Sequence, residues 1–112
     1  MFTAIWILAA HFIADFVLQA RWIGLNKSKN EWVLLLHIAI YTAAMSVMLL
    51  PLDLPPIFFA INAAAHWLTD WCSSRLGGYF FKKNNLYMFW NVIGLDQLAH
   101  GAFLLYTLSE FT

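Results

Sequence analysis

Residues 2–22, FTAIWILAAHFIADFVLQARW, form the first of four apolar-dominated stretches in this chain. The other three lie at residues 31–50, 56–75 and 86–109. Each has roughly 20 residues, which as a helix is enough to cross a hydrocarbon layer about 30 Å thick. Hydrophobic residues make up 62% of the chain and charged residues 11%, far outside the range of soluble proteins. The sequence therefore predicts a polytopic membrane protein.

The connections between these stretches are short and rich in residues that break helices. They contain Gly24 and Asn30, then the Pro51–Pro56 turn, then the pair Gly77 and Gly78. Short connections make consecutive helices antiparallel neighbours. The 112 residues leave room for one domain. We expect an all-α fold in which residues 1–112 form a single up-down bundle of four antiparallel transmembrane helices.

The six basic residues are unevenly placed. Three follow the first stretch and three follow the third: Arg21, Lys27, Lys29, Arg75, Lys82 and Lys83. By the positive-inside rule both basic segments face the cytoplasm, so the two termini and the Pro51–Pro56 turn face outward. Six charges split over two short segments do not suit a nucleic-acid surface. We expect a lipid bilayer as the partner and no nucleic acid.

Three of the four histidines lie one helical turn from an aspartate. The pairs are His11-x-x-x-Asp15, His66-x-x-x-Asp70 and, in reverse order, Asp96-x-x-x-His100. A spacing of four residues places both side chains on one helix face, about 5–6 Å apart at Cβ. The fourth histidine, His37, lies in the remaining apolar stretch. Ionisable groups inside transmembrane segments are costly and usually functional.

The predicted topology explains the reversed order in the last pair. The first and third helices run inward, so in each the histidine lies outward of the aspartate. The fourth helix runs outward, and the order Asp96 then His100 puts its side chains in the same two layers. At a rise of about 1.5 Å per residue, His37 lies near the aspartate layer and Tyr41 near the histidine layer. All four helices are thus predicted to bring polar groups to one slab between the midplane and the cytoplasmic face.

A divalent metal ion would offset the cost of burying these groups. Each aspartate would otherwise cost roughly 2.5–3.5 kcal/mol at the bilayer centre. Imidazole and carboxylate ligands suit zinc first, with iron, manganese or nickel as alternatives. The predicted metal ligands are His11, Asp15, His37, His66, Asp70, Asp96 and His100.

The sequence leaves two forms of the metal site possible. In one, His11, His66 and His100 bind a single zinc ion and the aspartates orient them. In the other, the aspartates bind metal directly and two ions share all seven groups. In either form a metal-bound water could attack an ester or phosphoester. The predicted catalytic residues are Asp15, Asp70, Asp96, Tyr41 and Gln97, the last two as groups that hold the substrate or a developing oxyanion.

Two other interpretations compete with an enzyme. Each His–Asp pair could neutralise itself and join helices by hydrogen bonds, which would make the chain a structural membrane module without chemistry. Alternatively, Asp and His could relay protons or metal ions. The outer halves of the helices are nearly featureless, so such a conduit would require a homo-oligomer. The small residues Ala60, Ala63, Ala64 and Ala65 offer a packing face for one.

The motifs themselves resemble those of known families. His11-x-x-x-Asp15-Phe16-x-x-Gln19, His66-Trp67-x-x-Asp70 and Asp96-Gln97-x-x-His100 resemble a family of small bacterial and phage integral membrane proteins of unknown function. This resemblance implies a multi-pass protein of the bacterial inner membrane. More loosely, the His-x-x-x-Asp pattern is similar to that of the LexA-regulated membrane-bound proteins predicted to be metal-dependent hydrolases, although this chain lacks the adjacent His-His pair of many such members. We therefore expect metal-dependent hydrolysis of a lipid-like or phosphate-bearing small molecule.

Overall fold

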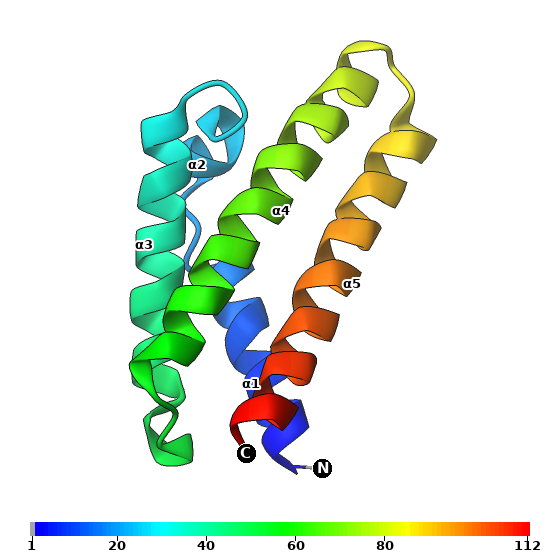
Figure 1. Cartoon of the computed structure of the whole chain (residues 1–112). Coiled ribbons are helices and arrows are strands. Elements are labelled where there is room, and N and C mark those ends of the chain that lie inside the picture. The colour runs from blue at the N-terminus through cyan, green and yellow to red at the C-terminus, as the bar shows by residue number, and fades with distance from the viewer. Residues whose placement is uncertain (1) are drawn as a thin grey trace.

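The computed structural model describes residues 2–112, and nearly all of them are helical. The elements are α1 (Phe2–Phe12), the π-helix η1 (Ile13–Val17), α2 (Arg21–Asn26), α3 (Glu31–Met48), the 3₁₀-helix η2 (Leu50–Leu52), α4 (Pro56–Lys82) and α5 (Leu86–Phe111). The four main helices alternate in direction, and both termini lie at the end opposite the α4–α5 connection (Figure 1). The predicted all-α class with four main helices is confirmed.

The turn residues found in the sequence account for most helix ends. The side chains of Asn30 and Asn85 each accept a hydrogen bond from a backbone N–H in the first turn of α3 and α5. Pro56 occupies the first position of α4, where its missing N–H costs nothing. Asp53 and Asn84 adopt left-handed backbone angles with φ of 51° and 57°, a conformation that Asp and Asn tolerate better than most residues.

The first predicted helix, residues 2–22, is not continuous. After η1 the chain leaves the helix, and Ala20 is extended with φ −64° and ψ 148°. Residues 18–20 contain no glycine or proline, so local propensity does not explain the break. It allows α2 to fold back against α3, with which it packs. Tertiary contacts therefore decide where this helix ends.

The third predicted helix, residues 56–75, is too short. α4 continues to Lys82 through Gly77 and Gly78, which the sequence predicted to lie in a connection. Each glycine costs about 1 kcal/mol in a helix interior. Packing against α5 offsets this cost, and a Cβ on Gly77 would lie 3.7 Å from the side chains of Phe89 and Val92. The two helices lie side by side up to a short connection (Figure 1).

By length and composition, α3 is the one helix among the described residues that could cross a membrane, with a mean hydropathy of 1.5. This is weak evidence of membrane association, and multi-pass topology does not follow from it. The long helices α4 and α5 do not meet the same criterion because polar residues lower their mean hydropathy. In α4 these include Asn62, His66 and Asp70, all of which are buried in the bundle rather than on its surface.

An apolar core fills the end of the bundle near the termini. Its buried members come from α1, η1, α3, α4, α5 and the α3–η2 junction: Ile7, Ala10, Ala14, Tyr41, Met45, Leu49, Phe58, Leu104 and Leu108. Interhelical hydrogen bonding accompanies this packing, because Asn62 of α4 donates to the hydroxyl of Thr107 in α5 at 3.0 Å. The core fixes the helices at one end and leaves polar side chains to fill the next layer.

Phe58→Ala tests the apolar core. Phe58 is 1% exposed, so the variant should lose about 3–5 kcal/mol of stability by creating a cavity. The measurement is thermal unfolding of the purified protein followed by circular dichroism. Leu98→Ala is the matched control, since Leu98 is 68% exposed and should change stability little. Equal melting temperatures for the two variants would contradict this packing.

Candidate metal centre

The seven predicted metal ligands lie together inside the bundle. They come from α1 (His11), η1 (Asp15), α3 (His37), α4 (His66, Asp70) and α5 (Asp96, His100). All seven are buried, and none is more than 9% exposed. These five elements thus contribute polar side chains to one layer, next to the apolar core.

Four of these residues make the tightest group, which we call the four-ligand cluster: Asp15, His37, His66 and Asp70. His37 Nε2 lies 3.0 Å from Asp15 Oδ1, 3.1 Å from Asp70 Oδ2 and 3.1 Å from His66 Nε2. His66 Nε2 lies 3.5 Å from the same Asp15 oxygen and 3.3 Å from the same Asp70 oxygen. Two ring nitrogens and two carboxylate oxygens therefore converge on one point.

These separations match tetrahedral coordination. Ligand atoms at about 2.0–2.1 Å from a zinc ion are about 3.3–3.4 Å from one another when the geometry is tetrahedral. Hydrogen bonding explains the same contacts less well. The single proton on a neutral Nε2 can be donated along one direction, whereas His37 Nε2 has three polar neighbours within 3.1 Å. A cation among the four atoms would bind all of them.

Two looser groups share residues with the cluster. His11, Asp15 and His100 can place one ligand atom each within 4.8 Å of one another, and so can Asp70, Asp96 and His100. Within residues 2–112, no such group contains His11, His66 and His100 together. The geometry thus favours aspartates as direct ligands over the predicted three-histidine form of the site.

Tyr41 and Gln97 hold ligands in place. The Tyr41 hydroxyl is 2.7 Å from His11 Nδ1. Gln97 Nε2 donates to Asp15 Oδ2 at 3.1 Å and to Asp96 Oδ2 at 3.0 Å, while its Oε1 lies 3.1 Å from His11 Nε2. Both side chains therefore orient the predicted ligands, and their predicted contact with substrate remains a prediction.

Lys27 and Ser73 belong to this site although the sequence did not predict them. Lys27 Nζ lies 3.4 Å from Asp70 Oδ2 and donates to Gln19 Oε1 at 3.2 Å. Lys27 reaches the site because the break after η1 allows α2 to fold back. No local sequence pattern predicts that break. The Ser73 hydroxyl donates to Asp96 Oδ1 at 2.5 Å. Its position one turn after Asp70 was the available signal, since residues three apart share a helix face.

The charges of the site balance only if two of its histidines are protonated or a further cation is bound. Three aspartates are buried, and Lys27 is the one Lys or Arg that contacts any of them within the described part of the chain. With neutral histidines, two negative charges remain uncompensated. One divalent cation would neutralise them and remove the cost of burying unpaired charge.

Comparison with known proteins gives a family. A family model described as "Protein of unknown function (DUF3307)" matches residues 3–112. The chain belongs to the DUF3307 family. No curated protein and no solved structure shows a significant match. Membership confirms the predicted relation to a family of unknown function, and the link to the predicted hydrolases stays a proposal.

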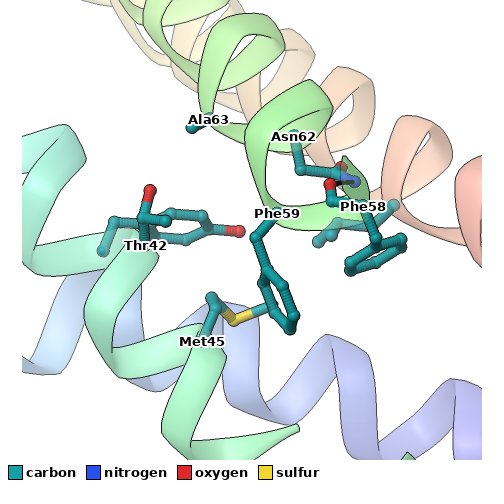
Figure 2. A pocket seen from close by; sticks show the side chains of 8 residues that line it. Thr42, Met45, Phe58, Phe59, Asn62 and Ala63 are labelled. Atoms are coloured by element: carbon teal, nitrogen blue, oxygen red, sulfur yellow. Dashed lines mark hydrogen bonds between the residues drawn. The ribbon is translucent and has the colours of Figure 1, made fainter. Parts of the chain in front are cut away.

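Two cavities adjoin the site of this DUF3307 protein. The smaller has a volume of about 10 Å³, room for one water molecule at most, and lies where Thr42 and Met45 of α3 face Phe59 and Ala63 of α4 (Figure 2). The larger, about 220 Å³, is lined by Tyr41, Asn62, Ala65, His66, Leu68, Thr69, Ala99, His100, Phe103 and Leu104. A small molecule would therefore have room beside His66 of α4 and His100 of α5.

Lys27→Gln tests the charge balance of the DUF3307 site. Removing the cation beside Asp70 should lower the stability of chelator-treated protein by about 1–3 kcal/mol, because a buried carboxylate loses a partner. Added zinc should remove most of that difference by supplying positive charge at the same carboxylate. The measurement is thermal unfolding with and without zinc.

Lys29→Gln is the matched control for this variant. Lys29 lies in the same connection and is exposed. Equal destabilisation by both substitutions, or a loss that zinc does not restore, would contradict the contact between Lys27 and Asp70.

Proposed function

We propose that this protein is a membrane-embedded metal-dependent hydrolase whose metal site is the four-ligand cluster. The observation that carries the proposal is the convergence of two Nε2 atoms and two carboxylate oxygens at separations of 3.0–3.5 Å. Their donor set, two imidazoles and two carboxylates, suits zinc, iron or manganese. Zinc is the first choice because it favours four ligands in a tetrahedron.

The cross-helix geometry argues against simple pairing within helices. The His11–Asp15 pair is 3.8 Å apart, whereas Asp15 lies 3.0 Å from His37 on another helix. Likewise Asp70 lies nearer to His37 of α3 than to His66, its neighbour on α4. A purely structural module would need one or two such contacts to join its helices. The convergence of four groups on one point is more specific than that role requires.

The distribution of side chains supports a bilayer environment. The buried layer is polar, whereas large apolar side chains such as Phe12, Leu68 and Leu95 are exposed on α1, α4 and α5. A soluble protein of this size would not leave so many large apolar side chains in water. Lysines near the α2–α3 and α4–α5 connections lie at one end and both termini at the other (Figure 1). By the positive-inside rule this arrangement supports a multi-pass protein of the bacterial inner membrane with its termini outside.

The larger cavity supports a lipid-like or phosphate-bearing substrate. Leu68, Phe103 and Leu104 supply apolar walls, and His66 and His100 supply polar groups in the same cavity. An apolar tail would lie against the walls, and its hydrolysable group would meet the metal site. A bound divalent ion would supply a Lewis acid and an activated water there. Asp15, His37, His66 and Asp70 would hold the ion, while Tyr41 and Gln97 fix His11 and Asp15.

A conduit for protons or metal ions is less well supported. The apolar core, including Ile7, Met45 and Phe58, fills the bundle on the side of the termini. A pathway through one copy would have to cross that largely apolar layer, where the buried side chains of Asn62 and Thr107 are hydrogen-bonded to each other. A homo-oligomeric conduit would need its pathway between subunits instead.

Metal analysis tests the proposed site. Protein purified in detergent without chelator should contain at least about one divalent ion per chain, and a His37→Ala/His66→Ala variant should lose at least about nine-tenths of it. The measurement is elemental analysis by mass spectrometry. Hydrolysis of a chromogenic ester or phosphoester in mixed micelles should fall together with the metal content.

Trp67→Ala is the control for that experiment, because Trp67 neighbours His66 on α4 but lies at the surface. It should keep the metal content of the unaltered protein. Metal-free unaltered protein would overturn the proposed function.

Reporter fusions test the proposed topology. Alkaline phosphatase fused after Thr112 should be active because that terminus is predicted to face outward. The same enzyme inserted after Asn84, in the α4–α5 connection, should be inactive, and green fluorescent protein should give the opposite pattern. The unfused protein should also stay in the membrane fraction after alkaline carbonate washing. Release by carbonate, or the reverse reporter pattern, would contradict a multi-pass protein of this orientation.

A further inference from the structure

We infer that a second divalent cation binds beside the first, held by His11 and His100, and that Asp15 and Asp70 bridge the two ions. The inference rests on the proposed function, because it takes the four-ligand cluster as the first site. It adds a second site, a bridging role for two aspartates and a substrate class. The reaction would then be hydrolysis of a phosphate ester.

The two carboxylates carry the argument, because each divides its oxygens between two sets of groups. Asp15 turns Oδ1 toward His37 and His66, and its Oδ2 lies 3.8 Å from His11 Nε2. Asp70 turns Oδ2 toward the same two histidines, and its Oδ1 lies 3.7 Å from His100 Nε2. Carboxylates placed in this way can each bridge a pair of cations, which in two-metal sites lie about 3.5–4 Å apart.

His100 is placed to bind a metal ion. It is 5% exposed, yet neither of its ring nitrogens has a hydrogen-bond partner within residues 2–112. Burying such a group without a partner is unfavourable. A cation at Nε2 would satisfy it, and Asp96 Oδ2, 3.3 Å from Nδ1, is close enough to orient the ring from behind. Carboxylates commonly take this position behind metal-binding histidines.

His11, on α1, faces the same second cation site as His100. Its ring centroid lies 5.4 Å from that of His100, and its Nδ1 is held by the Tyr41 hydroxyl at 2.7 Å. Its Nε2 is 3.1 Å from Gln97 Oε1 and would exchange that contact for the cation. The second site is also wider, with His-to-Asp separations of 3.7–3.8 Å against 3.0–3.5 Å in the cluster. The second ion should therefore bind more weakly than the first.

Charge identifies the class of substrate. With neutral histidines, the three aspartates and Lys27 together carry two negative charges, which one divalent ion neutralises. A second divalent ion leaves two positive charges in a buried site, and a phosphate monoester dianion would neutralise them. The larger cavity, lined by His66 and His100, has apolar walls for the rest of the molecule. The substrate would be an amphipathic phosphate ester with its phosphate at the two ions.

The reaction balances without any other reactant. A water oxygen forms a bond to phosphorus, and the bond from phosphorus to the ester oxygen breaks. The departing ester oxygen receives a proton that the water loses, so the products are an alcohol and inorganic phosphate. Two-metal sites stabilise both the attacking and the leaving oxygen in such displacements.

Manganese titration of the full chain in detergent tests the second site. Chelator-treated protein should bind two Mn²⁺ per chain, the second at least about tenfold more weakly, and the loaded protein should give the electron paramagnetic resonance spectrum of a spin-coupled pair. His11→Ala/His100→Ala should bind one ion and give an uncoupled spectrum. Leu98→Ala, an exposed substitution on α5, should keep two coupled ions. Circular dichroism checks that each variant is folded, and His100→Gln replaces the double variant if that one does not fold.

The outcomes separate this inference from the proposed function. No bound metal in the unaltered protein overturns both. One ion, or two ions without coupling, overturns the bridged second site and leaves the first site standing. Two coupled ions that persist in the His100 variant overturn the role of His100.

Substrate preference tests the phosphate assignment. In mixed micelles, para-nitrophenyl phosphate should be hydrolysed at least about tenfold faster with two ions bound than with one, because the second ion stabilises the transferred group. Hydrolysis of para-nitrophenyl butyrate without hydrolysis of the phosphate would keep a metal-dependent hydrolase but overturn a phosphate ester as its substrate class.

Discussion

The structure depends on burying three carboxylates in a bundle of only 112 residues. Asp15, Asp70 and Asp96 cannot remain charged in such surroundings without partners, because unpaired buried charge is expensive. Their partners are four histidines, one amide, one hydroxyl and one lysine from different segments. The closest His–Asp contacts join separate helices rather than neighbours on one helix, so these contacts also link η1, α3 and α4.

The backbone around Asp15 is adapted to this arrangement. Asp15 lies in a π-helical turn, a local widening that often occurs at functional sites. The chain leaves the helix directly afterwards and returns through α2, which brings Lys27 to Asp70. The apolar core at the other end of the bundle supplies the packing that keeps these irregular residues in place.

Beside its apolar core the bundle buries a polar layer, and many large apolar side chains lie on its surface. Polar groups gather inside, and much of the outer surface is apolar. The same arrangement lowers the mean hydropathy of α4, because its polar residues count against it although they are buried. A hydropathy average counts Asn62, His66 and Asp70 in the same way whether they are buried or exposed.

The sequence by itself determined the all-α class and the four main helices, and it singled out the seven residues that the structure buries together, because apolar stretch length and the four-residue His–Asp spacing are local properties. It placed the starts of α3, α4 and α5 at the residues where they lie. It failed where packing outweighs propensity: the break after Val17 and the continuation of α4 through Gly77. Helical periodicity says which residues share a face, but not how far that face is rotated toward each neighbour. Only the tertiary structure decided that His37 joins Asp15, His66 and Asp70, that Lys27 reaches the site, and that each of two carboxylates faces two sets of histidines.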